Sequence, residues 1–233
     1  MKYLYKKELN YYFNNPIGYI VVILFAVFAN FLFVKDIFLV GSASLRPFLG
    51  LLPWLLMIFI PALTMRILSE EKRTNTIEVL LTLPVSETQI VLAKFLALFN
   101  LLGIGLLLTV GLPLSLRLLT KIYLPEILIG YVGLLLLGGA LISLSMFFSS
   151  LTKNQVVAFL SSTMVIFVFL VLSTDFTASV LPKIIQDWLS YFAPVYHLQN
   201  FVKGVIDLRS IFYFCSLTIL FLFLTVIDLE KRK

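Results

Sequence analysis

Residues 127–152 read ILIGYVGLLLLGGALISLSMFFSSLT, and these 26 residues contain no Asp, Glu, Lys, Arg or His. An α-helix rises about 1.5 Å per residue and a bilayer core is about 30 Å thick, so roughly 20 residues make one crossing. The stretch is therefore long enough to cross a membrane once and too short to cross it twice. It also exceeds the roughly 10 alternating residues of a transmembrane β-strand.

Five more runs of the sequence share this lack of charge: 17–34, 47–65, 95–116, 154–174 and 210–227. Each is long enough for one crossing. The sequence therefore predicts an all-α integral membrane protein with six transmembrane helices in one domain over residues 1–233. The predicted spans are about 17–34, 47–66, 92–116, 127–150, 154–174 and 210–228.

The composition of the whole chain agrees with this class. The 233 residues are 61% hydrophobic and 13% charged, with a mean hydropathy of +1.05. Soluble domains are about 25% charged and about 45–50% apolar, so a soluble globular fold is excluded. The apolar content also excludes a disordered chain. Cys215 is the only cysteine, which excludes a disulfide scaffold, and we expect it to be a buried thiol in the last span.

The orientation follows from Lys and Arg near the span ends. Six spans put both termini on the same side. If that side is the cytoplasm, eleven Lys and Arg residues lie inside and seven lie outside. This bias predicts cytoplasmic termini, because positive flanks favour the cytoplasm. Phe31, Leu32, Phe33 and Val34 continue the first apolar run without a polar stretch, which indicates an uncleaved anchor. We expect a multi-pass membrane protein with both termini in the cytoplasm.

Residues 2–13 are predicted to form an amphipathic helix ahead of the first span. Tyr5, Leu9, Tyr12 and Phe13 fall on one helical face, and Pro16 follows shortly after them. A basic helix with aromatic residues is typical of the cytoplasmic membrane interface. The alternative is a basic flank that only fixes the orientation.

The loop between the second and third spans holds four of the twelve acids. A short helix is predicted from Thr76 to Leu83, ending at Pro84. Ser86 and Gln89 match a capping box at the start of the next helix. The short helix could lie on lipid or dock on a cytosolic partner. Its acidic flanks favour the partner, because the leaflet surface is also negative.

The outer loop between the fifth and sixth spans contains amphipathic stretches. One precedes Pro194, and a second short helix fits from about Tyr196 to Lys203, ended by Gly204. We predict re-entrant or interfacial helices that form an outer lid; its candidate residues are Trp188, Tyr196 and His197. The alternative is an amphipathic linker that only rests on the membrane.

The sequence carries no recognisable catalytic motif. It has no G-x-x-x-x-G-K-[ST] phosphate loop, no C-x-x-C, no H-E-x-x-H and no G-x-S-x-G. His197 is therefore expected to be a residue of the lid rather than a catalytic base. The six runs contain no ionisable residue, which disfavours an ion-coupled carrier or a channel for charged substrates. We predict no enzyme activity, no bound cofactor, no metal and no nucleic-acid partner.

The segment EEKRTNTIEVLL from Glu70 to Leu81, followed by Pro84-Val85-Ser86, resembles the cytoplasmic segment of type-2 ABC exporter permeases. It is most similar to the gliding-motility-type branch. Asn75 stands where that family usually has Gly, and Asn is the residue that next best tolerates a left-handed backbone. The outer segment of the same branch is similar at Pro194, His197, Asn200, Phe201 and Gly204-Val205-Ile206.

The resemblance implies a coupling helix, at about Glu71 to Leu83, that sits in a groove of a separate ABC ATPase subunit. ATP and Mg²⁺ would then belong to that partner. Two permease subunits, a homodimer or close paralogues, would pair with two ATPases. Ile77, Leu80 and Leu81 would be the apolar anchors. The docking residues implied in this way are Glu70, Glu71, Thr76, Ile77, Glu78, Leu80, Leu81 and Pro84.

The resulting hypothesis is the permease subunit of an ABC exporter. The alternative from another class is a polytopic membrane enzyme acting on lipid or peptide bonds. It is the weaker hypothesis, because no acid–base or metal constellation can be assembled from the sequence. The transported substrate cannot be read from the residues.

Overall fold

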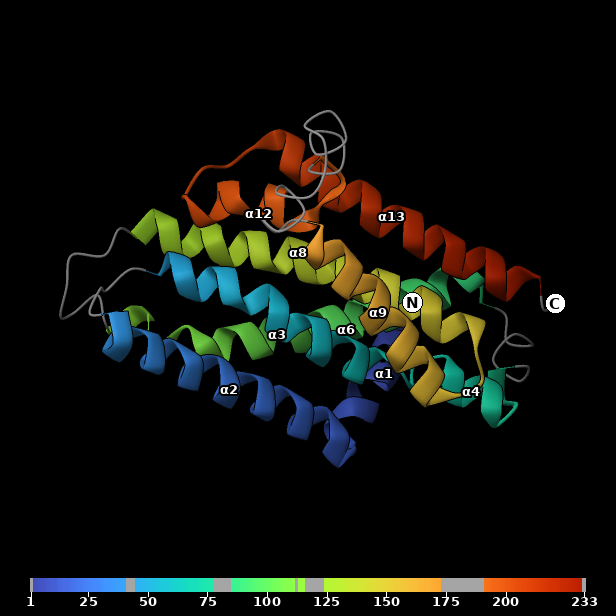
Figure 1. Cartoon of the computed structure of the whole chain (residues 1–233). Helices are drawn as coiled ribbons and strands as arrows, with labels where there is room; N and C mark the ends of the chain where they lie inside the picture. Colours follow the sequence, from blue (N-terminus) through green and yellow to red (C-terminus); the bar gives the residue numbers. More distant parts are fainter. Residues whose placement is uncertain are drawn as a thin grey trace.

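The computed structural model describes residues 2–40, 45–77, 85–111, 113–115, 124–172 and 191–231, and within them every regular element is a helix. The helices run largely along one common direction, with α4 and the C-terminus toward the same end (Figure 1). Their bounds are α1 Lys2–Asn14, α2 Pro16–Val40, α3 Arg46–Thr64, α4 Ser69–Arg73, α6 Glu87–Thr109, α8 Leu124–Leu151, α9 Gln155–Val171, α12 Pro194–Val202 and α13 Leu208–Glu230.

Five of these helices, α2, α3, α6, α8 and α13, are long and apolar enough to cross a membrane. Their positions agree with five of the six predicted spans. The remaining prediction, 154–174, corresponds to α9, which is apolar but has 17 residues. That is shorter than the roughly 20 residues of a full crossing. The all-helical class is confirmed, and the sixth span stays a prediction.

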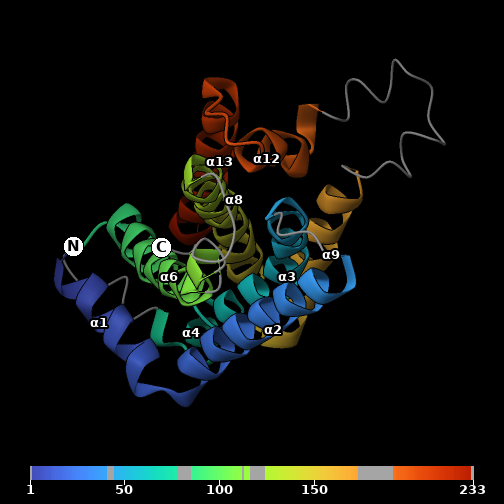
Figure 2. The same cartoon turned by 90° about the vertical axis from the view of Figure 1, so that its left-hand side faces the viewer.

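α8 is the central helix of the bundle. It lies between α12 and α13 on one side and α3 and α6 on the other (Figure 2). In its most apolar stretch 72% of the residues are buried, compared with 22% in α13. Glycines allow this packing: a Cβ added at Gly133 would lie 2.5 Å from Phe201 Cβ, and one at Gly138 would lie 2.3 Å from Leu102 Cδ2. Small residues thus let α12 and α6 approach α8 closely.

The predicted N-terminal helix is present as α1, which packs against α6 and α2. Of the predicted apolar face, Tyr12 is buried at 6% exposed, Tyr5 and Leu9 are half-buried, and Phe13 is 43% exposed. Glu8 is also buried, at 7% exposed, where its carboxylate pairs with Lys94 of α6.

Two predicted helix boundaries are confirmed. Ser86 is the N-cap of α6, and its hydroxyl oxygen accepts a hydrogen bond from Gln89 N at 3.3 Å. Gly204 follows α12 with φ +77°, the left-handed geometry expected of a helix stop. One expectation was wrong: Cys215 is exposed on α13 rather than buried. The bundle leaves that side of α13 free of packing within the described chain.

Candidate docking site at the α4 end of the bundle

A short turn at residues 65–68 separates α3 from α4, and a serine of α8 supports it. α3 ends at Thr64 and α4 begins at Ser69. Backbone amides of Leu68 and Ser69 donate to Ser149 Oγ at 3.3 and 3.2 Å, and Ser149 Oγ donates to Met65 O at 3.1 Å. These bonds replace helical partners that the turn removes, because buried backbone amides need acceptors. The position of α4 is therefore fixed by α8.

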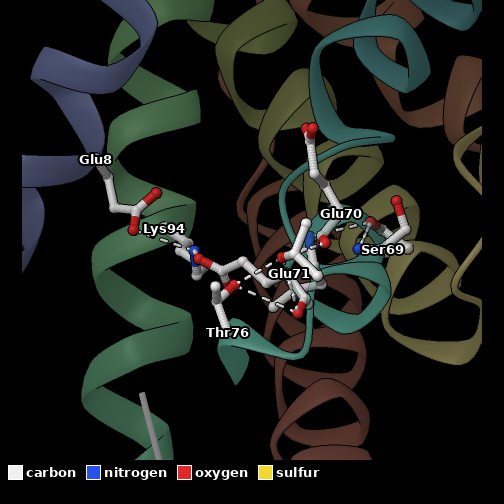
Figure 3. A network of polar contacts seen from close by, with 9 residues as sticks. Glu8, Ser69, Glu70, Glu71, Thr76 and Lys94 are labelled. Atoms are coloured by element: carbon white, nitrogen blue, oxygen red, sulfur yellow. Dashed lines mark hydrogen bonds and ion pairs between the residues drawn. The ribbon is translucent and has the colours of Figure 1, made fainter. Parts of the chain in front are cut away.

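A buried lysine ties α4 to two other helices. Lys94 Nζ donates to Glu71 Oε1 at 2.7 Å and to Glu8 Oε1 at 3.1 Å. The Lys94 side chain is 2% exposed, so its charge is balanced by these two carboxylates rather than by water. Figure 3 shows the Glu8 and Glu71 side chains extending toward Lys94 from opposite directions. α1, α4 and α6 are thus joined through one ammonium group.

Lys72, the residue after Glu71, links α4 to α13. Lys72 Nζ pairs with Asp228 Oδ2 at 2.7 Å, and the Lys72 side chain is 1% exposed. Asp228 lies near the C-terminal end of α13. Consecutive residues of α4 are therefore paired with two different membrane helices.

The turn after α4 contains a left-handed residue. Asn75 has φ 56°, and among the described residues it is the one non-glycine with positive φ. This confirms the prediction that Asn75 serves where glycine is usual. The flanking threonines stabilise the turn: Thr74 Oγ1 donates to Glu70 O at 2.9 Å and lies 3.0 Å from Thr76 Oγ1.

A polar pocket of about 380 Å³ lies between α1, α4 and α6. Tyr12 is part of its wall, and its hydroxyl donates to Leu63 O at 3.1 Å, near the end of α3. Burial, together with the negative charge of Glu8, raises the pKa of Tyr12 well above its usual range. The hydroxyl therefore remains a hydrogen-bond donor at every physiological pH. The pocket is lined by Lys7, Glu8, Tyr11, Tyr12, Arg66, Ile67, Glu70, Glu71, Thr74, Thr76 and Lys94.

Four of the eight predicted docking residues lie in the described chain. Glu70, Glu71 and Thr76 come together around this pocket. Ile77, predicted as an anchor for the partner, is 6% exposed and packs in the hydrophobic core of the protein itself. The other four, Glu78, Leu80, Leu81 and Pro84, lie outside the described residues.

Two of the three predicted lid residues, Tyr196 and His197, lie on α12. His197 is 8% exposed, and its ring stacks on Tyr213 with centroids 4.1 Å apart. Its Nε2 donates to Tyr191 O at 2.9 Å, and its Nδ1 lies 3.3 Å from Ser210 Oγ. Tyr196 is 44% exposed, and Trp188 lies outside the described residues. His197 is thus a packed residue that joins α12 to α13.

Sequence reasoning missed the charged contacts that hold α4. It treated Lys72 and Lys94 only as positive flanks, and it gave no role to Glu8 or Asp228. One signal was available, because Glu8 is the only acid of the basic N-terminal helix. Its partner could not be named, since Lys94 lies 86 residues away in the sequence.

The fold and this site define a class of protein: a multi-pass helical membrane protein whose charged side chains hold a short surface helix at one end of the bundle. The sequence model of the ABC-2 family transporter protein matches residues 6–227. The chain belongs to the ABC-2 transporter family, and it is the permease subunit of an ABC exporter. No match was found among curated proteins. Permeases of this family typically carry no catalytic site and work with an ABC ATPase.

Proposed function

We propose that the segment from Ser69 to Pro84 is the coupling segment on which a separate ABC ATPase docks. The observation that carries this proposal is the double attachment of α4. Glu71 is paired with Lys94 of α6, and Lys72 is paired with Asp228 of α13. A short helix held in this way moves together with two membrane helices. Closure of the ATPases on ATP would therefore be transmitted to the bundle.

The surface of the segment suits a protein partner. The side chains of Glu70 and Glu71 are 29% and 23% exposed. Thr74, Asn75 and Thr76 are exposed. Leu80 and Leu81 are the proposed apolar anchors, with Glu78 and Pro84 flanking them. Ile77 is not proposed to contact the ATPase. It is buried against the permease and so holds the segment on the bundle.

Several features of the working assembly belong to the same proposal. ATP and Mg²⁺ bind to the ATPase chain, and the permease carries no cofactor or metal of its own. Two permease subunits, a homodimer or close paralogues, pair within the bacterial inner membrane with their termini in the cytoplasm. The likeness to the gliding-motility-type branch supports this arrangement. ATP hydrolysis by the partner drives either the movement of a substrate across the membrane or the transmission of a mechanical force across it.

The proposal assigns α12 to a lid at the outer end of the bundle. α12 packs against α8 at Gly133 and against α13 through His197. In the proposal this lid lies at the outer membrane surface and includes Tyr196 of α12 and Trp188. Lid opening would follow the movement of α13, whose opposite end carries Asp228.

Co-purification with an ABC ATPase that is co-expressed with the permease tests the docking proposal. We expect Leu80→Asp/Leu81→Asp to abolish assembly, because two charges would replace the apolar anchors. Lys153→Asp is the matched control, since Lys153 is an exposed residue of the turn between α8 and α9. Unchanged assembly and unchanged ATP turnover of the double variant would contradict the proposal.

A further inference from the structure

A chain of three polar contacts joins α12 to the start of α13. His197 Nε2 lies 2.9 Å from Tyr191 O, and His197 Nδ1 lies 3.3 Å from Ser210 Oγ. Ser210 Oγ in turn lies 3.4 Å from Asp207 Oδ2. His197 is 8% exposed and Ser210 is 0% exposed, so these two side chains depend on their neighbours for hydrogen bonds.

The charge state of His197 decides how many of the three contacts are hydrogen bonds. Tyr191 O only accepts, so the first contact requires a proton on Nε2. If the ring is neutral, Nδ1 is then an acceptor, and the single hydroxyl proton of Ser210 can serve either Nδ1 or Asp207 but not both. If the ring is an imidazolium, Nδ1 donates to Ser210 Oγ and the hydroxyl donates to Asp207. All three contacts are hydrogen bonds only in the charged state.

Two neighbours of the ring suit a positive charge. The ring centroids of His197 and Tyr213 lie 4.1 Å apart with planes 19° apart, and an aromatic face attracts a cation at this distance. Asp207 is the N-cap of α13, and its carboxylate reaches the ring through Ser210. This negative charge offsets the partial positive charge of the helix N-terminus, which would otherwise oppose a cation.

Asp207 is the acid that faces His197, and Tyr196 and Tyr213 are the phenols whose rings contact it. The elements that pack against α12 are α3, α8, α9 and α13. Their other charged residues, with the lysine directly after α12, are Arg46, Glu126, Lys203, Arg209, Asp228 and Glu230. Arg46 is paired with Glu126 and Asp228 with Lys72, whereas the remaining three are exposed.

The order of the three side chains is not that of a serine hydrolase. In a catalytic triad the histidine lies between the serine and the acid. Here Ser210 lies between His197 and Asp207. The Ser210 hydroxyl is also fully buried, so it is closed to a substrate. The arrangement is therefore suited to holding a proton rather than to catalysis.

We propose that His197 binds a proton and thereby tightens the joint between α12 and α13. Protonation adds one hydrogen bond and one charge attraction across the joint, so a falling pH strengthens it and a rising pH weakens it. Histidine side chains change charge between about pH 5 and about pH 8. That the proton comes from the outer side rests on the proposed function. The chemistry of the joint does not, because all its groups belong to the permease.

Nuclear magnetic resonance of the full-length permease tests the proton site directly. His197 is the only histidine of the chain, so ¹⁵N-histidine labelling without a polyhistidine tag gives the signals of one ring. We expect the neutral ring with its proton on Nε2 at about pH 8 and the imidazolium at about pH 5.5. A ring that keeps one charge state at both pH values, or that carries its single proton on Nδ1, would overturn the proposal.

Hydrogen exchange of the backbone amides of α12 measures the joint itself. Their protection in the wild type, divided by that in His197→Gln at the same pH, should rise about tenfold between about pH 8 and about pH 5.5. The division removes the direct effect of pH on exchange, and the size of the rise is that of one added charge-assisted hydrogen bond. A ratio that does not change with pH would contradict the proposal.

A second pair of variants separates the proton effect from folding. Asp207→Asn keeps a good N-cap but removes the negative charge, so protection of α12 should rise less at low pH than in the wild type. Gln199→Ala is the matched control, because Gln199 is an exposed residue of α12, and it should keep the full rise. Equal rises in Asp207→Asn and Gln199→Ala would show that His197 and Asp207 do not act together.

Discussion

Glu71 and Lys72 are consecutive residues of α4, and they form ion pairs with two different membrane helices. Glu71 Oε1 lies 2.7 Å from Lys94 Nζ of α6, and Lys72 Nζ lies 2.7 Å from Asp228 Oδ2 of α13. A helix of five residues has little packing area of its own. Its position is instead fixed by these pairs and by Ser149.

Lys94→Met should destabilise the permease by about 3 kcal/mol, because two carboxylates lose the cation that neutralises them. The measurement is thermal or denaturant unfolding of the purified chain. Lys153→Met, which removes an exposed lysine, should leave the midpoint unchanged.

Removing the two carboxylates as well should restore the stability that Lys94→Met loses. The triple variant Glu8→Gln/Glu71→Gln/Lys94→Met removes every charge of the cluster, and such replacements are often neutral. It should recover most of the lost stability. Equal unfolding midpoints for Lys94→Met and Lys153→Met would show that the cluster does not hold α4.

Ser149→Ala should cost about 1–3 kcal/mol, since it leaves the amides of Leu68 and Ser69 without their acceptor. Ser150→Ala is the control, because within the described residues Ser150 Oγ donates to Phe147 O of its own helix. The measurement is the unfolding midpoint of each of the two variants. A control variant that loses as much stability as Ser149→Ala would contradict the role of Ser149 in the turn.

The places of five long helices could be predicted from charge-free runs alone, because the bilayer sets their length. The sixth run corresponds to the shorter helix α9. Neighbouring residues in the sequence were also enough to predict that Ser86 caps α6 and that Gly204 ends α12. Contacts between distant segments could not be predicted in this way. Lys94 illustrates the limit: charge counting identifies it as a positive flank, but its two partners depend on how α1 and α4 pack.

For the candidate site, the sequence identified the segment but not how it is held. Ile77 shares a predicted apolar face with Leu80 and Leu81, and periodicity cannot tell which of them faces the bundle. The structure shows that Ile77 is buried against the permease. On α1 the apolar pattern identified Tyr12, which is buried, but it could not identify Glu8, whose burial depends on its pairing with Lys94.

Asn75→Gly should preserve assembly and stability, whereas Asn75→Val should cost about 1–2 kcal/mol, because a β-branched residue is strained at φ 56°. The strain falls on the turn that leads into the proposed coupling segment. ATP turnover of the complex should therefore drop in Asn75→Val and stay near wild type in Asn75→Gly. Similar turnover in both variants would argue against a fixed turn at this position.

Gly133→Ala should destabilise the packing of α12 on α8, because its Cβ would lie 2.5 Å from Phe201 Cβ. A cost of about 1–3 kcal/mol is expected from overpacking. Gly103→Ala is the control: nothing lies within 4 Å of a Cβ added there. That change should be neutral or stabilising by up to about 1 kcal/mol in a helix. Thermal unfolding distinguishes the two, and an unchanged midpoint for Gly133→Ala would rule out the close contact.

Site-specific photo-crosslinking tests the central claim most directly. A benzoylphenylalanine introduced in place of the exposed Thr76 is irradiated in membranes that contain both the permease and its ATPase. We expect an adduct with the combined mass of the two chains from the probe at Thr76. We expect none from the same probe at Val205, which is exposed next to α12. An ATPase that co-purifies with the permease but forms no adduct at Thr76 would contradict docking on this segment.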